Sequence, residues 1–395
     1  MSLIKSYQQQ LLDQAQYAYR HTPISAATQQ AYWAVPRHLF VQRYREWGVR
    51  KWHEIRPENL KEHLATLYQD RPLILFGDDD DCIPSTISVP SFVLRMLDML
   101  QLRPGQSVFE LGAGSGWNAA LMGQLVGPTG HVSSVEIIPE IAQAAASTIA
   151  SLNQNNVSII PGDGGEGYAP RAPYDRAIFT AGSYDLPRHF YDQIREDGLL
   201  LIVIKSEGGG DNLFLLRKKP DCFESLDAMT CSFVQLTGKY QLDLEPTQLE
   251  ALPEWAELQH CEVFRMPFWW GGKGKEDFQW RTSGIRFFLS VSEPIFRTYK
   301  IEVGDNHSRE EHYFGLWDQA NHSLVLAKDD LLIAYGNTVA KEVLLQKTRE
   351  WLDLGMPSAA SFKLCVYPSG VPLTAHAGQW LVKRCESQFL WCLEN

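Results

Sequence analysis

The sequence predicts an α/β fold, with a doubly wound, mostly parallel sheet in its first half and a second domain of α+β type behind it. Short apolar strands alternate with helices between about residues 90 and 219. The strand expected at 199–204 is almost wholly apolar, as in a parallel sheet that is covered on both faces. Beyond residue 220 this alternation is lost, so we place the two domains at 1–220 and 221–395.

Proline and glycine mark the limits of the elements expected in the first domain. Helices are expected at 8–19, at 28–34, from residue 57 onward, and at 91–100. Strands are expected at 107–111, 130–136, 157–160, 174–179, 199–204 and 212–217, with helices at 117–126 and 141–153 between the first three. The order is that of consecutive strand–helix–strand units.

The second domain gives a less regular pattern. Strands are expected at 284–291, 323–327 and 362–367, and one amphipathic helix is expected at 338–353. Eight of the 12 tryptophans lie beyond residue 250, which supports two domains of different character.

Composition argues against several classes of protein. The formal net charge is −11, and because phosphate contacts need Lys and Arg, no nucleic-acid partner is expected. No apolar run reaches the roughly 18 residues of a membrane-spanning helix, and the first residues turn polar too soon for a signal peptide. We therefore expect no membrane partner and a cytoplasmic location. The oligomeric state stays open.

The cysteines and histidines do not indicate a metal centre. The seven cysteines include no Cys-x-x-Cys pair, which is typical of reduced thiols rather than of a zinc site or a disulfide framework. His307 and His312 are five residues apart, so they do not share one face of a helix. No metal site is predicted.

A glycine-rich segment, Glu110-Leu111-Gly112-Ala113-Gly114-Ser115-Gly116, lies between an expected strand and an expected helix. Glycine permits positive φ and lets a ligand approach the backbone closely. In open α/β sheets, ligands bind beyond the carboxyl ends of the strands. The segment indicates a nucleotide-like ligand, although a tight turn alone would also account for it.

Acidic residues end or follow the next two strands. Glu136 ends the second strand, where a carboxylate can accept hydrogen bonds from both ribose hydroxyls. Gly162-Asp163-Gly164 follows the third strand, where Asp163 could reach an adenine edge or simply form the loop. Three such features at three successive strand ends favour a nucleoside ligand over a plain turn.

The glycine spacing distinguishes between cofactors. A dinucleotide site needs Gly-x-Gly-x-x-Gly to admit a pyrophosphate, whereas the third glycine here, Gly116, comes one position early. Glu110 beside the loop suits a cation rather than a phosphate. S-adenosylmethionine carries an ammonium and a sulfonium, so it is the predicted cofactor.

At this point the sequence resembles the protein-L-isoaspartate O-methyltransferase family over roughly residues 10 to 219. The segments that carry the resemblance are Val35-Pro36-Arg37-His38-Leu39-Phe40-Val41, Leu67 to Leu73, Thr86-Ile87-Ser88-Val89-Pro90, Val108 to Trp117, Val135 to Glu140, Gly162-Asp163-Gly164, Ala172 to Arg176, and Thr180-Ala181. Residues 221–395 resemble no family that we recognise.

The resemblance implies a Rossmann-like class I methyltransferase fold and methyl transfer to an isoaspartyl or aspartyl carboxylate of a protein or peptide. Its implied cofactor residues are Glu110, Gly112, Ala113, Gly114, Gly116, Glu136, Ile137, Gly162, Asp163, Gly164 and Thr180. Its implied substrate loop is Thr86, Ile87, Ser88, Val89 and Pro90, with Ser88 as the catalytic residue that orients the carboxylate. The second domain would select the substrate.

Two departures concern the acceptor rather than the cofactor. Val89 replaces the glutamine of the family's loop, which removes an amide, and Asp78–Asp81 form an acidic insertion just before it. Four carboxylates there would disfavour an anionic acceptor. A small-molecule methyltransferase and a cofactor-binding adaptor without catalysis therefore stay open, as does a plain turn or helix-capping role for Ser88.

Overall fold

The computed structural model describes residues 3–77, 85–208, 210–242, 244–270, 281–303 and 309–393. The acidic insertion Asp78–Asp81 and His307 lie outside these residues. Within them, no helix is long and apolar enough to cross a membrane, and no group of His, Cys, Asp and Glu side chains could hold a metal ion.

The chain forms two compact units that are each built from separate stretches of sequence. The first comprises Met1–Val203, Phe214–Leu226 and Phe233–Gln241, and the second comprises Ile204–Leu213, Asp227–Ser232 and Leu242–Asn395. The sequence predicts a single domain boundary near residue 220, whereas the chain passes between the two units several times between residues 203 and 242. The division falls within strands, which sequence patterns cannot reveal.

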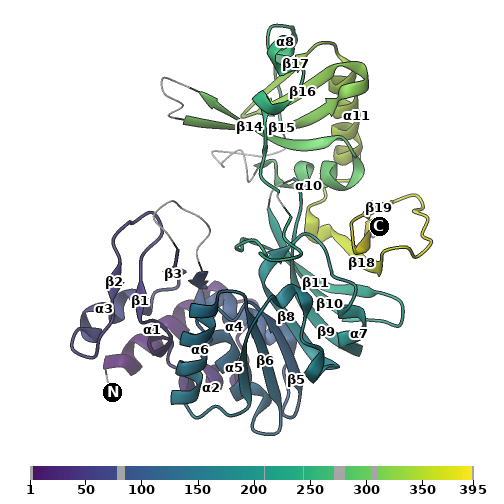
Figure 1. Ribbon diagram of the computed structural model, residues 1–395. Helices are drawn as coiled ribbons and strands as arrows, with labels where there is room; N and C mark the ends of the chain where they lie inside the picture. Colours follow the sequence, from purple (N-terminus) through teal and green to yellow (C-terminus); the bar gives the residue numbers. More distant parts are fainter. Residues whose placement is uncertain are drawn as a thin grey trace. The chain divides into compact units, whose positions relative to one another are not determined.

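The strands of the first unit confirm the predicted α/β architecture (Figure 1). Neighbouring strands follow the order β11 (Phe223–Cys231), β10 (Asp211–Lys218), β9 (Ile194–Lys205), β8 (Tyr174–Ser183), β5 (Ser107–Leu111), β6 (His131–Glu136) and β7 (Val157–Pro161). The pairs β5/β6, β5/β8 and β6/β7 are parallel. The expected end of this strand series near residue 219 is wrong, because β11 follows β10.

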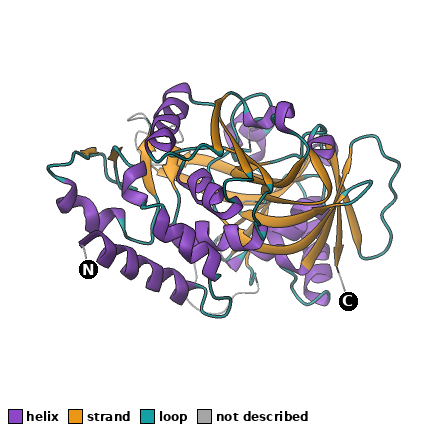
Figure 2. Cartoon of the chain, turned by 90° about the horizontal axis from the view of Figure 1, so that it is seen from below, coloured by secondary structure: helices purple, strands orange, loops and turns teal. Residues whose placement is uncertain are grey.

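Helices of the first unit cover these strands or one another, and Figure 2 distinguishes them from the strands by colour. They are α1 (Leu3–Ala18), α2 (Ala26–Ala34), α3 (Leu60–Leu67), α4 (Pro90–Leu100), α5 (Trp117–Val126), α6 (Pro139–Ser151) and α7 (Phe190–Gln193). Helix α5 packs against β5, β6 and β7, whereas α1 and α2 pack on α4. Because α5 is enclosed in this way, its apolar residues from Ala119 to Met122 are fully buried.

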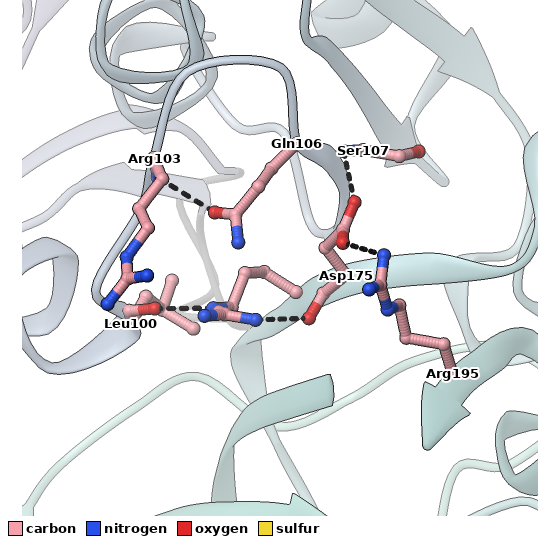
Figure 3. A network of polar contacts seen from close by, with 7 residues as sticks. Leu100, Arg103, Gln106, Ser107, Asp175 and Arg195 are labelled. Carbon is pink, nitrogen blue, oxygen red and sulfur yellow. Dashed lines mark hydrogen bonds and ion pairs between the residues drawn. The ribbon is translucent and has the colours of Figure 1, made fainter. Parts of the chain in front are cut away.

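A polar network fixes the amino ends of β5 and β8 (Figure 3). Asp175 accepts a hydrogen bond from the Ser107 amide at 2.8 Å and pairs with the Arg195 guanidinium. Arg176 donates from Nε to the Leu100 carbonyl at 2.7 Å. These contacts hold the amino ends of β5 and β8, and because the two strands are parallel, their carboxyl ends meet at the opposite edge of the sheet.

The second unit contains a separate sheet with the strand order β12 (Thr247–Gln248), β14 (Phe296–Val303), β15 (Arg309–Asp318), β16 (Ser323–Lys328), β17 (Leu331–Tyr335) and β13 (Glu262–Pro267). Helix α11 (Val339–Asp353) packs on β15 and β16. Strands β18 (Phe362–Pro368), β20 (Ser387–Leu393) and β19 (Gln379–Lys383) pair antiparallel. The strands expected at 323–327 and 362–367 and the helix expected at 338–353 are confirmed.

The strand predicted at 284–291 is wrong, because Ser283–Ser292 form helix α10. Its aromatic and β-branched residues indicated a strand. Ile285, Phe288 and Leu289 are nevertheless spaced as i, i+3 and i+4, and all three are fully buried. Burial of one helical face therefore decides the local structure over residue propensity.

Candidate cofactor and acceptor site

The segment Gly112–Gly116, here called the glycine loop, turns the chain from β5 into α5. Gly112 and Gly116 have φ of 88° and 83°, a conformation that favours glycine. A Cβ added to Gly112 would lie 2.6 Å from Thr180 Oγ1, and one added to Gly116 would lie 3.2 Å from the Ala145 Cβ. The neighbouring elements therefore leave no room for side chains, and the loop presents backbone.

Glu136 ends β6 directly beside the glycine loop. The Gly114 amide donates a hydrogen bond to its Oε2 at 2.8 Å, and the Ile138 amide donates to its Oε1 at 3.1 Å. Glu136 is 5% exposed, and burial raises its pKa, while these two hydrogen bonds act in the opposite direction. Parallel pairing of β5 and β6 thus brings the predicted acid and the predicted loop together.

Glu110 is completely buried beneath the same loop. Asn118 donates from Nδ2 to one carboxylate oxygen at 2.6 Å, and Ser134 donates from Oγ to the other at 2.5 Å. Burial raises the pKa of Glu110 to about 7, the two hydrogen bonds oppose this rise, and the charge of Glu136 adds to it. Because both oxygens are engaged, Glu110 links α5 to β6 next to the glycine loop.

Replacing Glu110 with Gln is expected to flatten the pH dependence of stability. The folded pKa of about 7 exceeds the ordinary 4.5, so the native state holds a proton that the unfolded state releases. The stabilisation is therefore present below about pH 4.5 and is lost as the pH rises towards 7, by up to about 1.4 kcal/mol per pH unit.

Urea unfolding of both proteins between pH 5 and about 8 measures this difference. A constant offset between them would reflect only altered hydrogen bonds to Asn118 and Ser134. Parallel curves across this range would contradict a titrating Glu110.

Asp163 follows β7 and makes the contacts of a loop-forming residue. Its Oδ1 accepts from the Gly165 amide at 2.8 Å within the short helix η2 (Gly164–Glu166), and its Oδ2 accepts from the Lys239 amide at 2.7 Å. Ile137, 37% exposed, offers an apolar surface at the end of β6. An adenine contact by Asp163 stays a prediction.

The segment Phe233–Gln241, which supplies the Lys239 amide, was missed by sequence reasoning. It returns to the first unit beside β8, where the Gly182 amide donates to the Val234 carbonyl at 2.7 Å and the Leu236 amide donates to Gly182 at 2.9 Å. Phe233 also contacts Phe92 of α4, with ring centroids 5.8 Å apart. The segment therefore lies beside the carboxyl end of β8 and contacts Asp163 after β7.

Thr180 joins β8 to the glycine loop. Its hydroxyl lies 2.8 Å from the Leu111 carbonyl and 2.6 Å from the Gly112 carbonyl, to which it donates. Ala113, which lies between Gly112 and Gly114 in the glycine loop, is 5% exposed. The predicted cofactor residues, from Glu110 to Thr180, therefore gather at the carboxyl ends of β5, β6, β7 and β8.

The segment Thr86–Pro90, here called the 86–90 loop, approaches the glycine loop. It begins in β4 (Ser85–Ile87), which pairs with β3 (Leu73–Phe76), and it leads into α4. The Thr86 carbonyl oxygen lies 3.6 Å from a Cβ built on Gly114. The two loops therefore lie so close that a side chain at position 114 would touch the 86–90 loop.

Ser88 does not cap α4. Val89 occupies the N-cap position without a side-chain hydrogen bond, and the Ser91 amide instead donates to Asp70 Oδ1 at 2.8 Å. The helix-capping interpretation of Ser88 is therefore wrong, because Asp70 meets the need of the helix terminus. Ser88 is half-buried, and its role in orienting an acceptor carboxylate stays a prediction.

Arg37 holds the 86–90 loop from beneath, and sequence reasoning assigned it no role. It is completely buried and donates to five backbone carbonyls at 3.1–3.3 Å, those of Leu67, Gln69, Arg71, Ile87 and Ser88. Its guanidinium lies 5.7 Å from the Trp117 ring, and burial lowers its pKa to about 10, which keeps it cationic at neutral pH. Its place in Val35–Val41 was the one available signal.

Residues 52–241 match the family model described as protein-L-isoaspartate(D-aspartate) O-methyltransferase (PCMT). Protein-L-isoaspartate O-methyltransferase from Ignicoccus hospitalis is 37% identical over 202 residues, which are 51% of this chain and 84% of that protein. Its counterpart from Methanothrix thermoacetophila is 39% identical over 206 residues, 52% of this chain and 85% of that protein. The matched region takes in Phe233–Gln241.

A solved structure of a protein-L-isoaspartate O-methyltransferase resembles a larger part of the chain. It has a TM-score of 0.53 and 21% sequence identity, and it covers 91% of this chain and 96% of its own. This likeness concerns the fold, which is that of a Rossmann-like methyltransferase. It reaches well beyond the half of the chain that the sequence relatives match.

Proposed function

Because the chain belongs to the protein-L-isoaspartate O-methyltransferase family, we propose that it is an S-adenosylmethionine-dependent methyltransferase that esterifies an isoaspartyl or aspartyl carboxylate of a protein or peptide. The observation that carries this proposal is the close approach of the 86–90 loop to the glycine loop at Thr86 and Gly114. The proposed acceptor-binding loop thus lies next to the proposed cofactor-binding loop.

The residues at the strand ends fit S-adenosylmethionine. The glycine loop offers backbone where a Cβ at Gly112 would strike Thr180, Glu136 offers a buried carboxylate for the ribose hydroxyls, and Ile137 offers an apolar surface for adenine. The pKa of Glu110 is about 7, and in its ionised form the negative charge favours a cationic ligand. S-adenosylmethionine supplies an electrophilic methyl group.

The acceptor needs orientation rather than activation. A carboxylate of pKa about 4 is already ionised at neutral pH, so no general base is required. Ser88 donates a hydrogen bond that aligns the carboxylate, and Arg37 fixes the Ser88 backbone through its carbonyl at 3.2 Å. Such positioning supplies several kcal/mol of the barrier reduction, about 7–11 kcal/mol in the best-oriented cases.

Transfer of a radiolabelled methyl group to an isoaspartyl peptide and to its aspartyl twin tests the proposal. We expect labelling of the isoaspartyl peptide in the presence of S-adenosylmethionine. Cofactor binding without methylation of either peptide would favour a small-molecule acceptor or a non-catalytic adaptor. Val89 replaces the glutamine of the family's loop and so lacks its amide. The preference between the two peptides therefore shows whether the 86–90 loop still distinguishes isoaspartyl from aspartyl groups.

Replacing Ser88 with Ala is expected to lower kcat/KM for the isoaspartyl peptide about 10- to 100-fold, since one hydrogen bond to a charged group is lost. Affinity for S-adenosylmethionine should not change, because the Ser88 hydroxyl belongs to the acceptor side. Ser147→Ala is the control, because Ser147 is an exposed serine of α6 whose hydroxyl donates to the Gln143 carbonyl of its own helix. Equal activity of wild type and Ser88→Ala would remove Ser88 from the mechanism.

We further propose that the region 221–395 selects the protein or peptide substrate. A net charge of −11 argues against nucleic-acid partners. The seven cysteines include no Cys-x-x-Cys pair, which is typical of reduced thiols and favours a cytoplasmic location. Deleting this region is not the sharpest test, because Phe233–Gln241 belong to the first unit. Point variants within the second unit, assayed on peptides and on intact proteins, separate selection from catalysis.

A further inference from the structure

The second unit contains a cavity of about 220 Å³ that lies outside the proposed methyl-transfer site. Its walls come from Ser206 and Glu207, which follow β9, from Leu244 and Pro246, from α10, and from the adjacent strands β14 and β15 of the sheet in Figure 1. All of these residues belong to the second unit. The volume suits a group of a few heavy atoms, below the roughly 300 Å³ at which drug-sized sites begin.

Two hydroxyl groups in the cavity wall lack a hydrogen-bond partner. Tyr299 on β14 is completely buried and Ser206 follows β9, and within the described residues neither Tyr299 Oη nor Ser206 Oγ meets a protein donor or acceptor. The Tyr299 ring is fixed by packing among Leu249, Trp255 and Leu258. A buried hydroxyl without a partner costs about 1–3 kcal/mol, so the arrangement is explained if a ligand supplies the partner.

A buried cation lies in the same wall. Arg286 of α10 is 8% exposed, and its guanidinium lies 5.9 Å from the Phe314 ring. Burial lowers the pKa of Arg286 to about 10, so it stays charged at neutral pH. Burial likewise raises the pKa of Tyr299, which keeps that hydroxyl protonated and able to donate.

Glu207 is the acidic residue that lines the cavity, and it already has a partner. Its carboxylate forms an ion pair with Arg297 Nη1 at 2.9 Å, and its side chain is 32% exposed. The buried part of the wall therefore presents hydrogen-bond donors and one positive charge. One positive charge matches a monoanion better than a phosphate dianion, since burying an excess of negative charge is costly.

We propose that this cavity binds a carboxylate group, with the Arg286 guanidinium and the Tyr299 and Ser206 hydroxyls as its hydrogen-bond donors. The carboxylate belongs either to a small organic acid or to an acidic side chain of a peptide. Arginine and hydroxyl donors around a carboxylate form charge-assisted hydrogen bonds, which are among the strongest in proteins. The site is distinct from the glycine loop, so the proposal stands or falls independently of the proposed methyl transfer.

Titration of the full-length protein with two matched pairs of ligands, followed by saturation-transfer NMR, tests the site. One pair is propionate and propionamide, and the other is acetyl-Gly-Glu-Gly-amide and its Gln twin. We expect millimolar binding of a carboxylate and none of its amide partner, and the tighter carboxylate identifies the source. Absence of carboxylate binding, or equal binding of acid and amide, would overturn the proposal.

Two conservative variants connect binding to the named atoms. Tyr299→Phe and Ser206→Ala should each weaken carboxylate binding about tenfold, without lowering the melting temperature of the unliganded protein and without changing the S-adenosylmethionine affinity. Tyr32→Phe is the matched control, because Tyr32 is equally buried but its hydroxyl donates to the Gln8 carbonyl at 3.0 Å. It should lower the melting temperature without affecting the carboxylate, and unchanged binding in both cavity variants would refute the assignment.

Discussion

Replacing Arg37 with Met is expected to lower the free energy of unfolding by about 4 kcal/mol or more. The guanidinium donates to five carbonyls from the 67–71 region and the 86–90 loop, and Met offers none of these donors. Each buried carbonyl left without a donor costs about 1–3 kcal/mol, although relaxation and water recover part of the sum. Since native proteins are stable by only about 5–15 kcal/mol, a large fraction of the stability is lost.

Chemical unfolding of wild type, Arg37→Lys and Arg37→Met measures this loss. Lys keeps the charge but has a single nitrogen, so we expect it to lie between the other two. Arg43→Met is the matched control, because Arg43 is exposed and its main contact is with the Trp52 ring at 3.9 Å. A loss below about 1 kcal/mol is expected there, and equal losses at the two positions would contradict a special role for Arg37.

Arg37 also marks how far the sequence could predict the site. The glycine loop and Glu136 were predicted because each lies at the end of an expected strand, and the parallel pairing of β5 and β6 brings these two together. The 86–90 loop was predicted only from its resemblance to a family segment, and its strand β4 belongs to a separate antiparallel pair. Arg37 reaches carbonyls 30 to 51 residues away, and no local pattern records which carbonyls lack donors.

The same reasoning explains the other differences. Strands β5, β6 and β7 were predicted because helices alternate with them, and β9 because it is almost wholly apolar. The segment Phe233–Gln241 instead returns to β8 through backbone pairing at Gly182, which leaves no residue signature. Helix α10 differs from the expected strand because its aromatic and β-branched residues favour a strand, whereas the i, i+3, i+4 spacing of Ile285, Phe288 and Leu289 buries one face of a helix. Ser88 was a candidate cap for α4 because it lies just before the helix. The Ser91 amide instead donates to Asp70, which is 21 residues away in sequence and so could not be predicted from local proximity.

Replacing Glu136 with Ala is expected to weaken S-adenosylmethionine binding at least about 100-fold. Two charge-assisted hydrogen bonds to ribose hydroxyls, each contributing about 1.5–3 kcal/mol, would be lost. The Gly114 and Ile138 amides would also lose their acceptor, so the glycine loop itself would loosen. Glu136→Gln retains one acceptor oxygen, and its affinity should fall between those of wild type and Glu136→Ala.

Calorimetric titration with the cofactor, combined with thermal unfolding of each variant, separates lost ribose contacts from a collapsed loop. If the loop alone matters, affinity should follow the melting temperature through the series; if the carboxylate binds ribose, affinity should fall further than stability. Glu140→Ala provides the control, since Glu140 is an exposed acid in the first turn of α6, four residues from Glu136. Wild-type affinity in Glu136→Ala would sink the assignment of the ribose contact, because no other described carboxylate both ends a strand and accepts from the glycine loop.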